Sequence, residues 1–227
     1  MNRTMVDIEA TGLNPKIDGL LQVAMVECYF NTNSKVWSPE HKVNVFFEST
    51  AYPKTLFAKK YQADLYRECR EKGIEFKTGV SEVQDFLEGC EKDEDGRVVF
   101  MGWNASFFDL PFLVEKGVLV RPGRRFINRG RQKREIPAGN FSHRIFDTQS
   151  LYRWILDMSG LEREDLDEEI EARKKPFLQT KISSKHDGLF DCYDQIADLN
   201  AMNEYVRDTL ADSLVKSNQG KGWRLGF

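Results

Sequence analysis

The sequence has few cysteines and no long apolar run, and each absence argues against a class of protein. The four cysteines are scattered without C-x-x-C spacing, which argues against a structural zinc site or a disulfide framework. No run of about 18 apolar residues is present, so we expect no membrane-spanning helix and no membrane partner. Reduced cysteines and the lack of a signal peptide lead us to expect a cytoplasmic protein.

The composition is that of an ordinary soluble globular protein. Of the 227 residues, 41% are hydrophobic and 30% are charged, which is enough to build a full core. The net charge of −3 argues against a uniformly basic nucleic-acid binder. No internal repeat or low-complexity linker divides the chain, so we predict one domain over residues 1–215 and a flexible, Gly-rich tail over 216–227.

The hydrophobic pattern predicts three strands followed by alternating helices and strands. Short turn-rich connections join the first three strands, which favours antiparallel pairing. The expected strands are residues 4–8, 20–30, 43–47, 97–101 and 144–146, and the expected helices are residues 57–72, 80–91, 108–116, 148–158 and 189–213. This order predicts an α/β fold with a mixed five-stranded sheet, in which three antiparallel strands are followed by parallel strands, and with helices on both faces.

Charge is distributed unevenly in two segments. Lys116–Arg134 holds eight basic residues and no acid, with Phe126 among them, whereas Glu162–Glu171 holds seven acids. The basic segment, in an expected insertion at about 116–143, is typical of a strand-binding element, because basic side chains neutralise phosphates and an aromatic ring can stack on a base. The alternative is a charged surface hairpin without a partner. The acidic segment is expected to form a solvated helix at about 161–173.

Asp7 and Glu9 lie two residues apart in an apolar segment that is expected to be a strand. Side chains two apart on a strand point to the same face, so the two carboxylates lie side by side. At about 4 Å and an effective dielectric constant of about 20, they would repel each other by roughly 4 kcal/mol. We therefore expect a compensating cation. Acids that face solvent at the end of a strand would explain the pair taken alone.

Two further acidic positions lie where helices are expected to begin. Asp109 follows Asn104 and Phe108 at the end of a predicted strand. The helix dipole alone favours an acid there, but it does not account for the asparagine or the aromatic residues. His186 precedes Asp191 by five residues, a spacing that cannot put both on one helical face. We therefore expect the histidine on the loop and the aspartate on the first turns of the last helix; the alternative is a surface histidine without a role.

These blocks together resemble the DEDD exonucleases, also called DnaQ-like 3′–5′ exonucleases, which have an RNase H-like fold. The resembling segments are Asp7-Ile8-Glu9 with Thr11-Gly12-Leu13, Asn104 to Asp109, His186 to Asp191, and Phe146 to Leu151, which is similar to an Asp-Thr-x-x-Leu segment of that family. The histidine of the third block is typical of the DEDDh branch, which includes proofreading subunits, RNase T and oligoribonuclease. The resemblance covers residues 4–205 and identifies residues 1–215 as a DEDDh exonuclease domain.

Some positions depart from the family pattern. The Gly-x-Asn…Phe-Asp-x-Pro-Phe-Leu sequence around Asp109 looks more like the exonuclease domains of family-B DNA polymerases. Those domains carry Tyr-x-x-x-Asp in the third block, which fails here because Tyr193 is followed four residues later by Ala197. The small alanine that usually lies two residues after the histidine is Gly188 in this chain. These departures bear on which nucleic acid is the substrate and leave the expected reaction unchanged.

The resemblance implies a metal-dependent exonuclease that trims single-stranded nucleic acid from its 3′ end and releases nucleoside 5′-monophosphates by a two-metal-ion mechanism. Converging carboxylates suit two Mg²⁺ or Mn²⁺ ions, and His186 would be the general base. The expected catalytic ligands are Asp7, Glu9, Asp109 and Asp191, and the expected substrate contacts are Thr11, Gly12, Leu13, Asn104, Phe108, Arg124, Arg125, Arg129 and Arg131. Leu13 is either a wedge against the terminal base or an ordinary core residue.

Asp194 and Asp198 follow Asp191 on the last predicted helix and lie within about 60° of it around the helix axis. This spacing makes them rival metal ligands. Their simpler interpretation is a solvated helix face, which would leave Asp191 as the ligand.

Four readings of the substrate and activity stay open from the sequence. Single-stranded DNA is the first choice, because of the polymerase-like second block, and a ribonuclease of the RNase T or oligoribonuclease type is the second, since the two differ at the 2′-hydroxyl. An inactive nucleic-acid-binding module on the same fold would be expected to lose a ligand or the base, and all five are present. The fourth is a nuclease subunit whose partner protein supplies specificity, with the acidic segment or the tail as contact. A homodimer is the other assembly that stays open.

Overall fold

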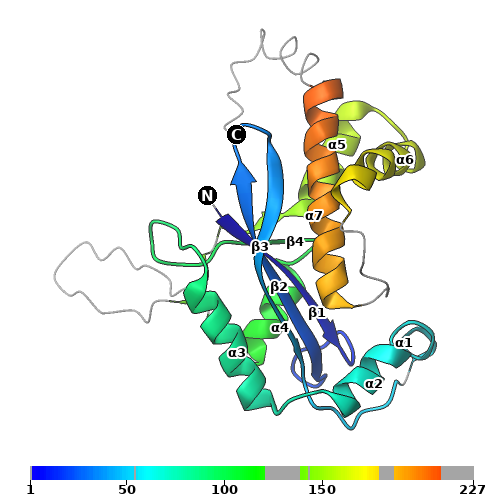
Figure 1. Cartoon of the computed structure of the whole chain (residues 1–227). Helices are drawn as coiled ribbons and strands as arrows, with labels where there is room; N and C mark the ends of the chain where they lie inside the picture. The colour runs from blue at the N-terminus through cyan, green and yellow to red at the C-terminus, as the bar shows by residue number, and fades with distance from the viewer. Residues whose placement is uncertain (1, 54, 121–138, 143, 179–186, 211–227) are drawn as a thin grey trace, which may run out of the picture.

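The computed structural model describes residues 2–53, 55–120, 139–142, 144–178 and 187–210 (Figure 1). The strands are β1 (Asn2–Ala10), β2 (Leu20–Asn31), β3 (Val36–Phe46), β4 (Phe100–Gly102) and β5 (Phe146–Asp147). They form one five-stranded sheet in the order β3-β2-β1-β4-β5. The first three strands pair in antiparallel fashion, while β4 is parallel to β1 and β5 is parallel to β4. The predicted mixed sheet is confirmed.

Helices connect and cover these strands. They are α1 (Leu56–Tyr61), α2 (Ala63–Glu71), α3 (Phe76–Gly89), α4 (Asp109–Glu115), α5 (Thr148–Ser159), α6 (Arg163–Lys174) and α7 (Gly188–Tyr205), with a short 3₁₀ helix at Lys175–Phe177 and a π-helical turn at Val206–Leu210. None of these helices combines the length and the apolar character that crossing a membrane requires.

The two predicted elements that differ most from the structure are the first helix and the third strand. The single helix expected over residues 57–72 is two helices, because the backbone leaves the helical conformation at Gln62, which ends α1 and precedes α2. The third strand begins at Val36 rather than at Val43. Its first half is largely exposed and polar, so it lacks an apolar alternation, and pairing with β2 makes it a strand.

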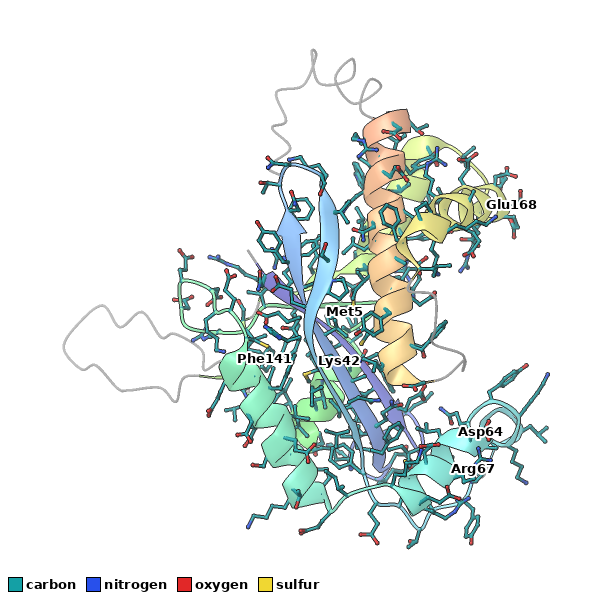
Figure 2. All side chains as sticks on the ribbon, in the orientation of Figure 1. Met5, Lys42, Asp64, Arg67, Phe141 and Glu168 are labelled. Atoms are coloured by element: carbon teal, nitrogen blue, oxygen red, sulfur yellow. The ribbon has the colours of Figure 1, made fainter. Side chains whose placement is uncertain are left out.

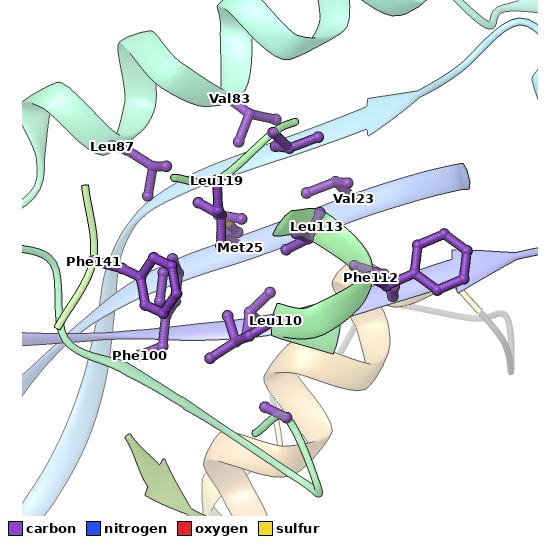
Figure 3. Close-up of a cluster of buried hydrophobic side chains, with 14 of the residues drawn as sticks. Val23, Met25, Val83, Leu87, Phe100, Leu110, Phe112, Leu113, Leu119 and Phe141 are labelled. Atoms are coloured by element: carbon purple, nitrogen blue, oxygen red, sulfur yellow. The ribbon is translucent and has the colours of Figure 1, made fainter. Parts of the chain in front are cut away.

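The two faces of the sheet support separate hydrophobic cores. Val6 and Ile8 of β1 belong to a core that contains Val83 of α3 and Leu113 of α4. Figure 3 shows side chains of α3 and α4 meeting those of β2 in this core. Met5 belongs to a second core, on the face covered by α5, α6 and α7. Helices therefore lie on both faces, as predicted.

The alternation along β1 decides where its acids point. Met5 faces the core under α7, whereas Val6 and Ile8 face the opposite core. Because successive side chains of a strand alternate between faces, Asp7 and Glu9 lie on the same side as Met5. Figure 2 shows Met5 in the interior between the sheet and α7, while Glu168 lies on the outer surface of α6. The two carboxylates thus point toward α7.

Helix α7 is attached to the sheet by a buried amide. Asn200 is 4% exposed. Its Oδ1 accepts the backbone N–H of Trp37 at 2.7 Å, and its Nδ2 donates to the carbonyl oxygen of Trp37 at 2.9 Å. One side chain thereby satisfies both backbone groups of a β3 residue and holds α7 at a set position along the sheet.

The packing predicts that truncating two aromatic residues close together in the chain lowers the free energy of unfolding by different amounts. Phe112 of α4 is 0% exposed, whereas Phe107 is 80% exposed. Phe112→Ala should lower the free energy of unfolding by about 3–5 kcal/mol, because it removes a fully buried ring and leaves a cavity. Phe107→Ala should change it by no more than about 0.5 kcal/mol. Urea denaturation of both variants measures this difference, and similar losses in the two would contradict the packing of α4.

Candidate active site

Three carboxylates converge where the end of β1 meets the start of α7. Asp7, Glu9 and Asp191 each contribute one oxygen to a group whose atoms lie within 4.8 Å of one another. In the part of the chain that the structure describes, no lysine or arginine forms an ion pair with any of the three. Oxygen ligands without a resident cation fit a hard divalent ion such as Mg²⁺ or Mn²⁺.

Asp109, the fourth expected ligand, begins α4 and is 5% exposed. Its Oδ1 accepts the backbone N–H of Ile8 at 3.0 Å, so it lies beside the strand residue that separates Asp7 from Glu9. It is not a member of the group of three oxygens that lie within 4.8 Å. Its charge still reaches Asp7: burial is the main cause of the raised pKa of Asp7, and repulsion from Asp109 is the next.

Burial and mutual repulsion make the ionised site costly without a cation. Burial, followed by repulsion from Asp191, raises the pKa of Glu9 to about 8. Burial raises the pKa of Asp109 to about 7 and that of Asp191 to about 6. Burial and the neighbouring carboxylates also raise the pKa of Asp7 well above its usual range. The carboxyl groups of this site therefore favour either protons or a bound cation.

The start of α7 is fixed against the strands by Gln22. Its Oε1 accepts the N–H of Gly188 at 2.9 Å, and its Nε2 donates to Asp187 Oδ1, the helix cap, at 2.8 Å. A Cβ atom at Gly188 would lie 3.2 Å from Asp7 Oδ2, so this close approach favours glycine. Asp191 then falls on the first turn of α7, as expected from the sequence.

Asp194 and Asp198 have a resident cation, and their interpretation as a solvated face was wrong. Lys174 at the end of α6 is 6% exposed. Its Nζ lies 2.7 Å from Asp194 Oδ2 and 2.9 Å from Asp198 Oδ1. Burial opposes the charge of Lys174, but the two ion pairs outweigh it and raise the pKa of the lysine. These aspartates brace α6 against α7.

A cavity of about 300 Å³ opens beside the carboxylates. It is lined by Asp7, Trp103, Asp191, Asp194, Gln195 and Asp198. Two glutamines donate hydrogen bonds to the acids of the site: Gln195 Nε2 lies 3.1 Å from Asp7 Oδ1, and Gln62 Nε2 lies 2.7 Å from Glu9 Oε2. Sequence reasoning missed both. Gln195 could have been found from its position four residues after Asp191, which puts it on the same helical face.

The turn after β1 holds three of the expected substrate contacts. Thr11 closes this turn, because its hydroxyl accepts the N–H of Gly19 at 2.8 Å. Gly12 lies against Asp18, where a Cβ atom would approach Oδ2 to 2.5 Å. Leu13 is 83% exposed, which excludes the core position that the sequence left open for it.

The turn before α4 presents a different aromatic ring from the one expected. Asn104 adopts a left-handed conformation with φ of 58°, and its carbonyl accepts the N–H groups of Phe107 and Phe108 at 3.0 and 3.2 Å. Phe108 is partly buried against the core, with its ring centroid 5.8 Å from that of Phe112. Phe107 is far more exposed than Phe108, and no pattern in the sequence singles it out.

Several expected residues lie outside the described part of the chain. They are His186, Arg124, Arg125, Arg129 and Arg131, together with most of the basic insertion at 116–143 and the tail at 216–227. Their roles stay predictions from the sequence.

Comparison with known proteins places the fold. No family model and no curated protein matches the chain. Among solved structures, the zinc-bound complex of E. coli exonuclease I with single-stranded DNA matches at a TM-score of 0.55 and 15% identity, over 95% of this chain and 43% of that one. Exonuclease I from Methylocaldum szegediense matches at 0.54 and 16%, over 96% and 43%. Cell-death related nuclease 4 matches at 0.58 and 12%, over 92% and 64%.

The chain has the RNase H-like fold of these nucleases. It spans less than half the length of exonuclease I and less than two thirds of that of cell-death related nuclease 4. At these identities the similarity shows the fold alone, and the carboxylates are what indicates the chemistry.

The raised pKa values predict that, in EDTA, the folded protein loses stability as the pH rises. Glu9 has a pKa of about 8 in the folded chain against an ordinary value of 4.5, so the folded protein holds a proton that the unfolded chain has released. Stability in EDTA should therefore fall as pH rises from about 5 to about 8. Glu9→Gln should weaken this fall, and the exposed control Glu168→Gln should follow the wild type. The melting temperature of each protein in EDTA, measured across this pH range, reports the loss of stability.

Saturating Mg²⁺ or Mn²⁺ should restore stability most at the high end of this range, because a cation replaces the protons. A melting temperature in EDTA that responds to pH equally in Glu9→Gln and in the wild type would contradict the electrostatic description of the site.

Proposed function

We propose that this protein is a metal-dependent 3′–5′ exonuclease that releases nucleoside 5′-monophosphates from single-stranded nucleic acid, with DNA as the first choice of substrate. One observation carries the proposal: oxygens of Asp7, Glu9 and Asp191 lie within 4.8 Å of one another on an RNase H-like sheet. The similar fold of exonuclease I, one structure of which contains single-stranded DNA, supports it.

The donor set fits Mg²⁺ or Mn²⁺, because carboxylate oxygens are the ligands that hard divalent cations prefer. Asp7, Glu9 and Asp191 would hold the metal, with Asp109 beside them. Two bound ions would supply positive charge for the attacking and leaving oxygens of an in-line displacement at phosphorus. The raised pKa values of Glu9 and Asp191 support this assignment, since burial, the main cause of both shifts, disfavours an uncompensated negative charge that a bound cation would compensate.

The remaining steps belong to side chains of this chain. His186 directly precedes Asp187, the cap of α7, and would take the proton of the attacking water. Leu13 and Phe107 are 83% and 80% exposed, which supports contact with bases rather than with the core. The arginines of the basic insertion would neutralise phosphates further along the strand.

The proposal predicts that activity depends on the metal and on the carboxylates. With 5′-labelled single-stranded DNA and Mg²⁺, the wild type should produce a ladder that shortens from the 3′ end, and EDTA should abolish it. Asp191→Asn should be inactive, because it removes a charged ligand, and the exposed control Glu168→Gln should be fully active. His186→Ala should lower the rate at least about a hundredfold, the size expected for a lost general base.

The assay separates the competing functions. Full activity of Asp191→Asn, activity in EDTA, or shortening from the 5′ end would each overturn the proposal. Faster cleavage of matched RNA would identify the ribonuclease reading. Tight binding of single strands by the wild type without any product in Mg²⁺ or Mn²⁺ would identify an inactive binding module.

The basic insertion gives a prediction about substrate length. Replacing Arg124, Arg125, Arg129 and Arg131 with glutamine should weaken the binding of long single strands, because each lost phosphate contact removes about 0.7 from the slope of log affinity against log salt. The KM should rise while the rate at saturation stays unchanged. Fluorescence anisotropy over a salt series measures the slope, and dinucleotides serve as the control, being too short to reach the insertion. An unchanged slope would mean that these arginines make no phosphate contacts and that the insertion is only a surface loop.

A further inference from the structure

The side chain of Gln195 joins the three segments that surround the cavity. Its Nε2 lies 3.1 Å from Asp7 Oδ1, and its Oε1 lies 2.8 Å from the backbone nitrogen of Trp103. Gln195 is on α7, four residues after Asp191, and lines the cavity with that residue. One amide group therefore links β1, the residue that follows β4, and α7.

The direction of this amide follows from the backbone. A backbone N–H group can only donate, so the N–H of Trp103 must meet the carbonyl oxygen of Gln195. The NH₂ group is thereby turned toward Asp7, and it can only donate to Oδ1. The backbone donor thus fixes the amide orientation, and the amide in turn holds one oxygen of the aspartate.

The second oxygen of Asp7 faces the start of α7. A Cβ atom built on Gly188 would meet Asp7 Oδ2 at 3.2 Å, which places Oδ2 beside the first residue of the helix whose first turn carries Asp191. With Oδ1 held by Gln195, Asp7 cannot rotate without losing that hydrogen bond. The hydrogen bond to Oδ1 and the close approach of Oδ2 to Gly188 together define one orientation of the carboxylate in the group of three.

We propose that Gln195 is a positioning residue that orients Asp7 for a divalent cation shared with Glu9 and Asp191. The inference rests on the proposed function, since it assumes that the site binds such a cation. Groups that orient a metal ligand through a hydrogen bond typically change metal affinity or activity by about 10–100-fold when they are removed. An effect of this size on metal affinity would distinguish a residue that orients Asp7 from one that only attaches α7 to the neighbouring strands.

Asn200 offers a matched control on the same helix. Like Gln195, it uses both ends of its amide, but both ends bond the backbone of Trp37 and neither meets a carboxylate. It lies nine residues further along α7 than Asp191 and does not line the cavity. Its loss should affect the attachment of α7 to β3 without changing the orientation of Asp7.

The test measures metal binding without nucleic acid. The wild type, Gln195→Met and Asn200→Leu are titrated with Mn²⁺, and free Mn²⁺ is followed by electron paramagnetic resonance. Gln195→Met should weaken Mn²⁺ binding by about 10–100-fold. Asn200→Leu should bind Mn²⁺ as the wild type does, even where its melting temperature falls more. Gln195→Ala is a second variant, at a position that is only partly buried.

Kinetics add a second readout. The concentration of Mg²⁺ that gives half-maximal activity should rise in Gln195→Met, while the KM for single-stranded DNA at saturating Mg²⁺ stays unchanged. Mn²⁺ affinity equal to that of the wild type in both Gln195 variants, or an equal loss in Asn200→Leu, would overturn the inference. Weakened Mn²⁺ binding in a protein that cleaves no nucleic acid would support the positioning role and reject the proposed exonuclease, so the two failures are distinguishable.

Discussion

The repulsion between Asp7, Glu9 and Asp191 is the constraint on which the rest of the structure depends. Burial adds to its cost: burial first and repulsion from Asp191 second raise the pKa of Glu9 to about 8. The surrounding residues limit its cost with hydrogen-bond donors: Gln195 and Gln62 donate to two of the three carboxylates, and the backbone of Ile8 donates to the adjacent Asp109. Donors reduce the charge locally but do not neutralise it, so the arrangement keeps its preference for a cation.

The sheet holds these charges together because β1 lies between β2 and β4, with a hydrophobic core on each face. Separating the carboxylates would require β1 or α7 to move. Helix α7 is attached to the strands at Gly188 through Gln22 and at Asn200 through Trp37. The packing energy of two cores and these buried amides therefore opposes the electrostatic repulsion.

The sequence predicted the features that depend on local pattern. The alternation along β1, the antiparallel start of the sheet and the first-turn position of Asp191 all follow from spacing within short segments. The sequence did not predict the break between two helices at Gln62, the first half of β3, or the pairing of Lys174 with Asp194 and Asp198. Each of these depends on a partner that is distant in the sequence or on a single backbone conformation, so no periodicity reveals it.

Helix α7 solves the same electrostatic problem in two ways within two turns. Asp194 and Asp198 share Lys174, a buried cation that pairs with both and offsets one of their two negative charges whenever the protein is folded. Asp191, three residues before Asp194, faces Asp7 and Glu9 instead, and no cationic side chain of the described residues pairs with this group. A lysine gives a permanent brace, whereas carboxylates without one can exchange protons for a metal ion. Lys174 lies beside Asp194 and Asp198. It therefore leaves Asp7, Glu9 and Asp191 available to bind a metal ion.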